Sequence, residues 1–153
     1  PLPGLADIVV AGSHPCDIEF WQAHKTLYPA EMAVKPGGTI IVVTPCPEGV
    51  SVMHPDMLSV TGLEAEQIEG LIESGQIEDV VSGALALAWA KVRRNAQVSL
   101  VSGGIGPEEA RALGFTPYAA VADALAAAFR RHGPDAKVTV LTHAPDSLPI
   151  FNG

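Results

Sequence analysis

The feature that most constrains the fold is a set of four short, continuous apolar runs rich in β-branched residues. They are Ala6–Gly12, residues 39–44, Gln97–Ser102 and residues 137–142. Each run has the length of a strand and shows little alternation, which is typical of strands buried on both faces. Segments with the apolar spacing of helices separate the runs. The sequence therefore predicts an α/β fold, with a mainly parallel central sheet of about four strands and helices on both faces in Rossmann-like layering.

Length and charge narrow the class of protein. The 153 residues suit a single α/β domain. The formal net charge is −8, and the only adjacent Lys or Arg pairs are Arg93-Arg94 and Arg130-Arg131, so we expect no nucleic-acid partner. No apolar run approaches the roughly 18 residues of a membrane span, and no leader pattern opens the chain. We therefore expect a cytoplasmic protein with no membrane partner.

Reactive side chains gather in the loops that follow the predicted strands. These are His14, Cys16, Cys46, Glu48 and His143. The carboxyl ends of parallel strands lie along one edge of a sheet, and ligands of open α/β sheets bind along that edge. The sequence therefore predicts that any binding site lies at this edge.

Two kinds of chemistry are open to the histidines and cysteines of these loops. His14, Cys16, Cys46 and His143 could together form a tetrahedral metal site, although their spacing fits no standard structural zinc pattern. Cys16 near a helix N-terminus could instead be a nucleophile with His14 or His143 as its base. Both cysteines also fit the role of small buried hydrophobic residues.

A glycine-rich turn at residues 102–106 leads into a predicted helix at Pro107. Backbone amides at a helix start attract anions. The glycine spacing matches neither a P-loop nor a dinucleotide fingerprint, and Glu108 and Glu109 place negative charge where an anion would bind. We expect a tight turn here.

The helix predicted after the first strand carries the leading candidate site. Gln22 and Lys25 are three residues apart and so share one helix face. Both side chains are hydrogen-bond donors, and the ammonium adds charge, so the pair could hold a carboxylate or a carbonyl. Asp17 is the predicted N-cap of this helix. The same pair also fits the solvated face of an amphipathic helix, and spacing alone leaves both readings open.

Taken together, these segments resemble the C-terminal domain of the nickel-pincer lactate racemase family. The matching segments are residues 12–25, 34–42, 46–49 and 98–115, with the Ala-rich helix and last strand that follow. The most specific part is Asp17-Ile18 followed by Gln22 and Lys25 at fixed offsets. The resemblance covers nearly the whole chain.

The resemblance implies that residues 1–153 are the C-terminal domain of a longer two-domain enzyme, and the opening Pro1 agrees with that expectation. In the family, the larger N-terminal domain holds the nickel-pincer nucleotide and the catalytic histidines, and the C-terminal domain closes over them. The implied reaction moves a hydride from C2 of a 2-hydroxy acid to the cofactor and back to either face of the keto acid. Gln22, Lys25 and Trp21 would contact the substrate, with Asp17 as support. No catalytic residue, metal site or bound cofactor is expected in this chain alone, which should be inactive when isolated.

Some positions depart from the family pattern. His14 and Cys16 replace residues that are more usual there, and the helix around Ala84 lacks the tryptophan that lines the substrate pocket of lactate racemase. These departures favour a substrate other than lactate, and a larger 2-hydroxy acid is one candidate. An alternative stays open at this point, in which the chain is a non-catalytic α/β module that binds a small anion or a partner.

Overall fold

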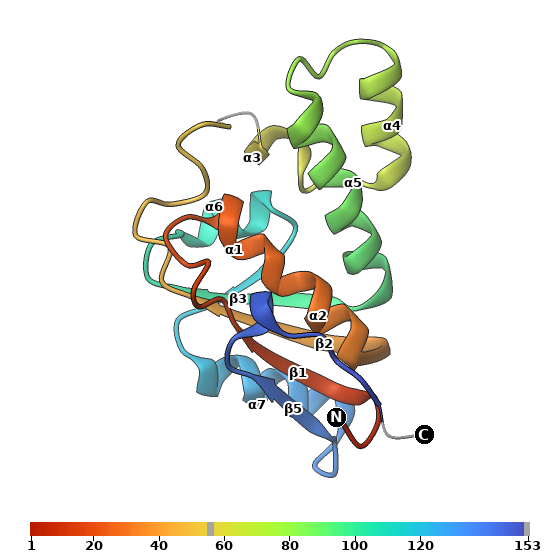
Figure 1. Cartoon of the computed structure of the whole chain (residues 1–153), viewed down its shortest axis with the longest axis vertical. Helices are drawn as coiled ribbons and strands as arrows, with labels where there is room; N and C mark the ends of the chain where they lie inside the picture. The colour runs from red at the N-terminus through yellow and green to blue at the C-terminus, as the bar shows by residue number, and fades with distance from the viewer. Residues whose placement is uncertain (55–56, 152–153) are drawn as a thin grey trace.

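A computed structural model describes residues 1–54 and 57–151. Its described part contains one five-stranded sheet of order β4-β3-β2-β1-β5, and every pair of neighbouring strands is parallel (Figure 1). The strands are β1 (Ala6–Gly12), β2 (Val34–Thr44), β3 (Gln97–Ser102), β4 (Thr116–Tyr118) and β5 (Val138–Leu141). The predicted α/β fold with a parallel sheet is confirmed.

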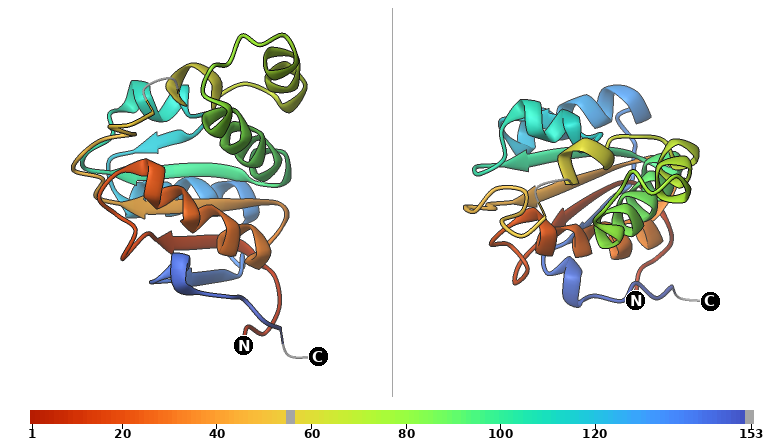
Figure 2. Two further views of the ribbon diagram at one scale, coloured as in Figure 1. Left: turned by 45° about the horizontal axis from the view of Figure 1, so that its top comes forward. Right: turned by 90° about the horizontal axis from the view of Figure 1, so that it is seen from above.

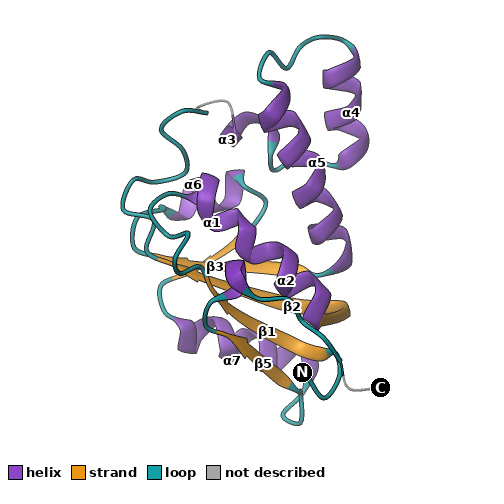
Figure 3. Ribbon diagram, viewed as in Figure 1, coloured by secondary structure: helices purple, strands orange, loops and turns teal. Residues whose placement is uncertain are grey.

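Helices cover both faces of this sheet. In chain order they are α1 (Phe20–Ala23), the 3-10 helix η1 (His24–Thr26), α2 (Leu27–Ala33), α3 (Met57–Val60), α4 (Ala65–Glu73), α5 (Val80–Asn95), α6 (Pro107–Ala112), α7 (Val121–His132) and the 3-10 helix η2 (Ala144–Asp146). Figure 2 shows α7 on one face and α1, α2 and α5 on the other. Helix α4 and the start of α5 form a hairpin that projects away from the strands (Figure 3).

The strand count differs from the sequence prediction by one. β4 is only three residues long and contains Pro117, so it has no apolar run to reveal it. It forms because Thr116–Tyr118 lies in register beside the edge of β3. Tertiary pairing creates this strand, whereas the other four carry their own pattern.

β2 begins five residues before the predicted residues 39–44. Val34 pairs with Ala6 and Thr39 pairs with Ile8, so the register advances by five residues along β2 while it advances by two along β1. Gly37 takes a φ of +78° within this irregularity, a conformation that favours glycine. The turn residues in the sequence therefore form a bulge inside one long strand.

The first helix does not begin where the sequence predicts. Asp17 is not its N-cap, because the helix starts at Phe20 with Glu19 in the cap position. Residues 17–21 instead run beside residues 46–50, and the carbonyl oxygens of Gly49 and Val50 accept the amides of Phe20 and Trp21, each at 2.9 Å. The loop thus satisfies helix amides that a capping side chain would have taken.

An aromatic cluster fills the face covered by α1, α2 and α5. Phe20 and Trp89 are fully buried and meet edge to face, with ring centroids 5.3 Å apart, and Phe115 lies 5.6 Å from Phe20. Under α7 the core is made mostly of aliphatic side chains and small residues, among them Ile8, Ile41 and Ala124. Among the helices of the described residues, none is long and apolar enough to span a bilayer.

Candidate functional site

The loops after β1, β2 and β3 meet at the carboxyl edge of the sheet, as the sequence predicts. The Cys46 amide donates to the Asp17 carbonyl oxygen at 3.0 Å. The Ser102 hydroxyl donates to the Pro45 carbonyl oxygen at 3.2 Å. These bonds tie segments that lie far apart in the sequence into one rim, and α1 rises directly from it (Figure 1).

The predicted pair on the first helix forms a direct contact. The Lys25 Nζ donates to the Gln22 Oε1 at 2.6 Å. Gln22 lies at the surface of α1 and is half-buried, whereas Lys25 on η1 is exposed. The remaining ammonium hydrogens of Lys25 and the amide N–H groups of Gln22 are the donors that the pair offers to a ligand. Such a donor set suits a carboxylate or a carbonyl oxygen.

Trp21, the third predicted contact residue, is fixed by a residue that sequence reasoning missed. Its ring stacks on the His54 ring with centroids 3.6 Å apart and an interplanar angle of 19°. The His54 Nδ1 lies 2.5 Å from the Asp79 Oδ2. Because a carboxylate only accepts hydrogen bonds, Nδ1–H donates here and Nε2 is the remaining ring nitrogen.

Asp79 anchors this arrangement at the start of α5. Its side chain accepts from the Val81 and Ser82 amides and from the Ser82 hydroxyl. The Ser82 hydroxyl, followed by His54, lowers the pKa of Asp79 to about 2, so the carboxylate is ionised at neutral pH. An aspartate before an apolar helix signals a cap, but no local pattern could connect it with His54, which is 25 residues earlier.

His24 lies beneath Trp21 and links it to the core. Its Nδ1–H donates to the Trp21 carbonyl oxygen at 2.6 Å, and its ring centroid is 5.5 Å from that of Trp89. Burial lowers the pKa of His24, an effect that outweighs the backbone bond to Trp21. His24 is therefore a neutral core residue at pH 7.

Asp17, predicted as support for the helix, lies at the rim in a different role. Its Oδ2 is 3.2 Å from the Nδ1 of the exposed His14. The ring of His14 in turn meets that of His143 edge to face at 5.3 Å. The structure thus groups Asp17 with the histidines that follow β1 and β5.

The proposed metal-ligand set does not assemble. His14 and His143 come together, but Cys46 is buried and bonded to the Thr44 hydroxyl. Within residues 1–54 and 57–151, no group of three or more His, Cys, Asp or Glu side chains is arranged to hold a metal ion. Burial raises the pKa of Cys46 to about 11, so its thiol is protonated at neutral pH and is not a nucleophile.

Cys16 is also poorly placed for nucleophilic catalysis by the predicted route. Its amide donates to the Ser13 carbonyl oxygen within the turn after β1, four residues before α1 begins. The helix N-terminus that the sequence predicts would lower the pKa of a nearby thiol lies at Phe20, so Cys16 is outside the first turn of α1.

The glycine-rich turn after β3 is a tight turn, as expected. The Ser102 hydroxyl oxygen accepts the amides of Gly104 and Ile105, each at 3.2 Å. The Glu109 carboxylate accepts the Gly106 amide at 2.7 Å. Three amides of this turn are therefore already bonded within the chain.

Comparisons with known proteins agree with the fold described above. A family model described as the lactate racemase C-terminal domain matches residues 4–149. The solved structure of the lactate racemase apoprotein from Thermoanaerobacterium thermosaccharolyticum has a similar fold, with a TM-score of 0.78 at 22% sequence identity. The match covers 94% of this chain and 35% of that chain, so this chain spans about a third of that racemase. None of the curated proteins compared with the chain matches it.

Proposed function

Because the chain belongs to the lactate racemase C-terminal domain family, we propose that it is the substrate-closing domain of a racemase or epimerase acting on a 2-hydroxy acid in the cytoplasm. The observation that carries the proposal is the contact between Lys25 and Gln22 at 2.6 Å. A 2-hydroxy acid has a carboxylate, and its keto form has a carbonyl, and both are acceptors for this donor pair.

The chain's own residues would bind and orient the substrate. The Lys25 ammonium would stabilise negative charge on the carboxylate or on the carbonyl oxygen, and the Gln22 amide would fix its direction by hydrogen bonding. Trp21 would form a wall of the site, held by the His54 stack at 3.6 Å. In a closed site that excludes water, these contacts gain strength.

The nickel-pincer nucleotide expected from the family would act as hydride acceptor and donor when bound. Gln22 and Lys25 fit this partner as donors to its oxygens, while the described residues offer no cluster of three metal ligands. We propose that the cofactor lysine, the nickel ligand and the acid–base pair belong to the N-terminal domain of the full-length protein. The 153-residue chain alone would then have no racemase activity.

The test is a panel of 2-hydroxy acids of increasing side-chain size, given to the full-length, cofactor-loaded protein. Chiral chromatography would follow interconversion of the enantiomers. We expect turnover of at least one acid larger than lactate, and no turnover by the isolated chain. If no member of the panel is interconverted but the intact protein binds small carboxylates, the non-catalytic anion-binding alternative replaces the proposal.

A further inference from the structure

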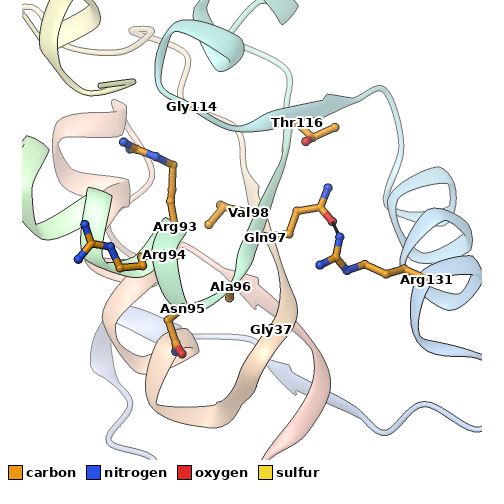
Figure 4. Close-up of a pocket in the computed structure, with 10 residues that line it drawn as sticks. All are labelled: Gly37, Arg93, Arg94, Asn95, Ala96, Gln97, Val98, Gly114, Thr116 and Arg131. Atoms are coloured by element: carbon orange, nitrogen blue, oxygen red, sulfur yellow. Dashed lines mark hydrogen bonds between the residues drawn. The ribbon is translucent and has the colours of Figure 1, made fainter. Parts of the chain in front are cut away.

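The amino edge of the sheet, opposite the rim described above, contains a cavity rich in arginine. Its volume is about 340 Å³, and three of the chain's five arginines line it. Arg93 and Arg94 come from the last turn of α5, and Arg131 from the last turn of α7. Gln97 and Thr116, the first residues of β3 and β4, complete its polar lining. Figure 4 shows Arg93 on one side of this space and Arg131 with Gln97 on the other.

Arg93 forms one side of the cavity without a carboxylate partner among residues 1–54 and 57–151. Its guanidinium donates only to backbone carbonyl oxygens, those of Thr61, Leu63 and Leu113. Gly114 lies against it, and a Cβ there would come within 2.8 Å of the Arg93 side chain. The guanidinium is thus locked in place while its charge is not neutralised by an ion pair.

Arg131 forms the other side, and its partner is also neutral. Its Nη1 donates to the Gln97 Oε1 at 3.1 Å, which leaves the Gln97 Nε2 hydrogens as donors. Arg94 differs, because it turns away in Figure 4 and pairs with Glu66 at 2.7 Å. Arg93 and Arg131 therefore line the cavity from opposite sides, and neither forms an ion pair with a described residue.

The arginines at this cavity concentrate positive charge locally in a chain with net charge −8. A guanidinium offers a fork of donors that matches a phosphate group. The volume lies at the lower end of the roughly 300–1,000 Å³ of small-molecule sites, which is enough for a phosphate with a small group attached.

We propose that this cavity binds a phosphate group, either as the free ion or as the ester of a small metabolite, through Arg131, Gln97 and the field of Arg93. The site is independent of the proposed racemase function, since it lies at the opposite edge of the sheet. The bound phosphate would join the carboxyl ends of α5 and α7 to the first residues of β3 and β4.

The test is calorimetric titration of the intact protein with inorganic phosphate and with ribose 5-phosphate. Arg131→Gln should weaken binding about tenfold or more, because it removes a charge-assisted contact. Arg130→Gln is the matched control, because it changes the neighbouring arginine in the same helix turn without touching the cavity, and binding should stay within about twofold. Tighter binding of the ester would identify a metabolite as the ligand, and equal affinity would identify free phosphate.

Gln97→Leu is the second variant, in case Arg131→Gln lowers the melting temperature. It removes the amide donors and keeps the shape, so it should weaken phosphate binding as well. The proposal is overturned if the wild-type protein shows no saturable heat up to about 10 mM phosphate, which corresponds to negligible affinity. It is equally overturned if Arg131→Gln and Arg130→Gln bind phosphate alike.

Discussion

The two layers of helices that cover the sheet differ in their packing and in their contact with the candidate site. On the face of α1, α2 and α5, aromatic rings run without a break from the deepest core to the surface. Trp89 touches His24, His24 touches Trp21, and Trp21 stacks on His54. Under α7 the packing is aliphatic and small, with Phe129 only half-buried, and no candidate site residue belongs to it. The first face therefore couples stability to the candidate site at the rim, whereas the packing under α7 includes none of that site's residues.

The strongest test of this difference replaces one aromatic residue on each face. Trp89→Ala should lower the free energy of unfolding by about 3–5 kcal/mol, because it empties a fully buried site. Phe129→Ala should cost less than half as much, since its ring is partly exposed. Urea denaturation measures both, and equal losses would show that the faces are equivalent.

The next largest effect concerns function on the first face. Under the proposed function, Lys25→Ala in the full-length protein should cost on the order of 2–4 kcal/mol of transition-state stabilisation, or about 30-fold to 1,000-fold in kcat/KM. Lys91→Ala is the matched control, since Lys91 is an exposed lysine on α5 with no place in the site. Similar kinetics for the two variants would remove Lys25 from the site.

A smaller effect should follow from freeing Trp21. His54→Ala removes the stacked ring and should lower kcat/KM about twofold to tenfold, in line with about 0.5–1.5 kcal/mol for an aromatic pair. His54→Phe keeps the stack but loses the bond to Asp79, so it should recover most of the activity. If His54→Gln recovers the activity and His54→Phe does not, the hydrogen bond to Asp79, and not the stack, positions Trp21.

The smallest effect is a pH dependence of stability that belongs to His24. Burial lowers its pKa in the folded state, so the unfolded chain binds the proton more readily. The neutral form contributes its full stability above the unfolded pKa near 6.5, and this contribution falls as the pH drops toward the lower folded value. The melting temperature should therefore fall less steeply between pH 7 and pH 5 for His24→Gln than for the wild-type protein. If the melting temperatures of the two proteins fall in parallel, the pH dependence belongs to other groups.

Much of this fold could be predicted because its signals are local. Ala6–Gly12 and Gln97–Ser102 have the same bounds in the sequence prediction and in the structure, since their apolar β-branched runs leave them no other stable environment than a buried sheet. The pair Gln22 and Lys25 could also be found, because three-residue spacing places them on one helix face wherever the helix begins.

The amino-acid sequence by itself determined the α/β class, the parallel sheet and a donor pair after the first strand, since each depends on residues close together in the chain. Tertiary structure alone decided the rest. It made β4 a strand by pairing it with β3, replaced Asp17 as cap with loop carbonyls, and brought His54 from one segment and Asp79 from another against Trp21. These contacts join residues that are distant along the chain, and such partners become neighbours only when the sheet and its loops close together.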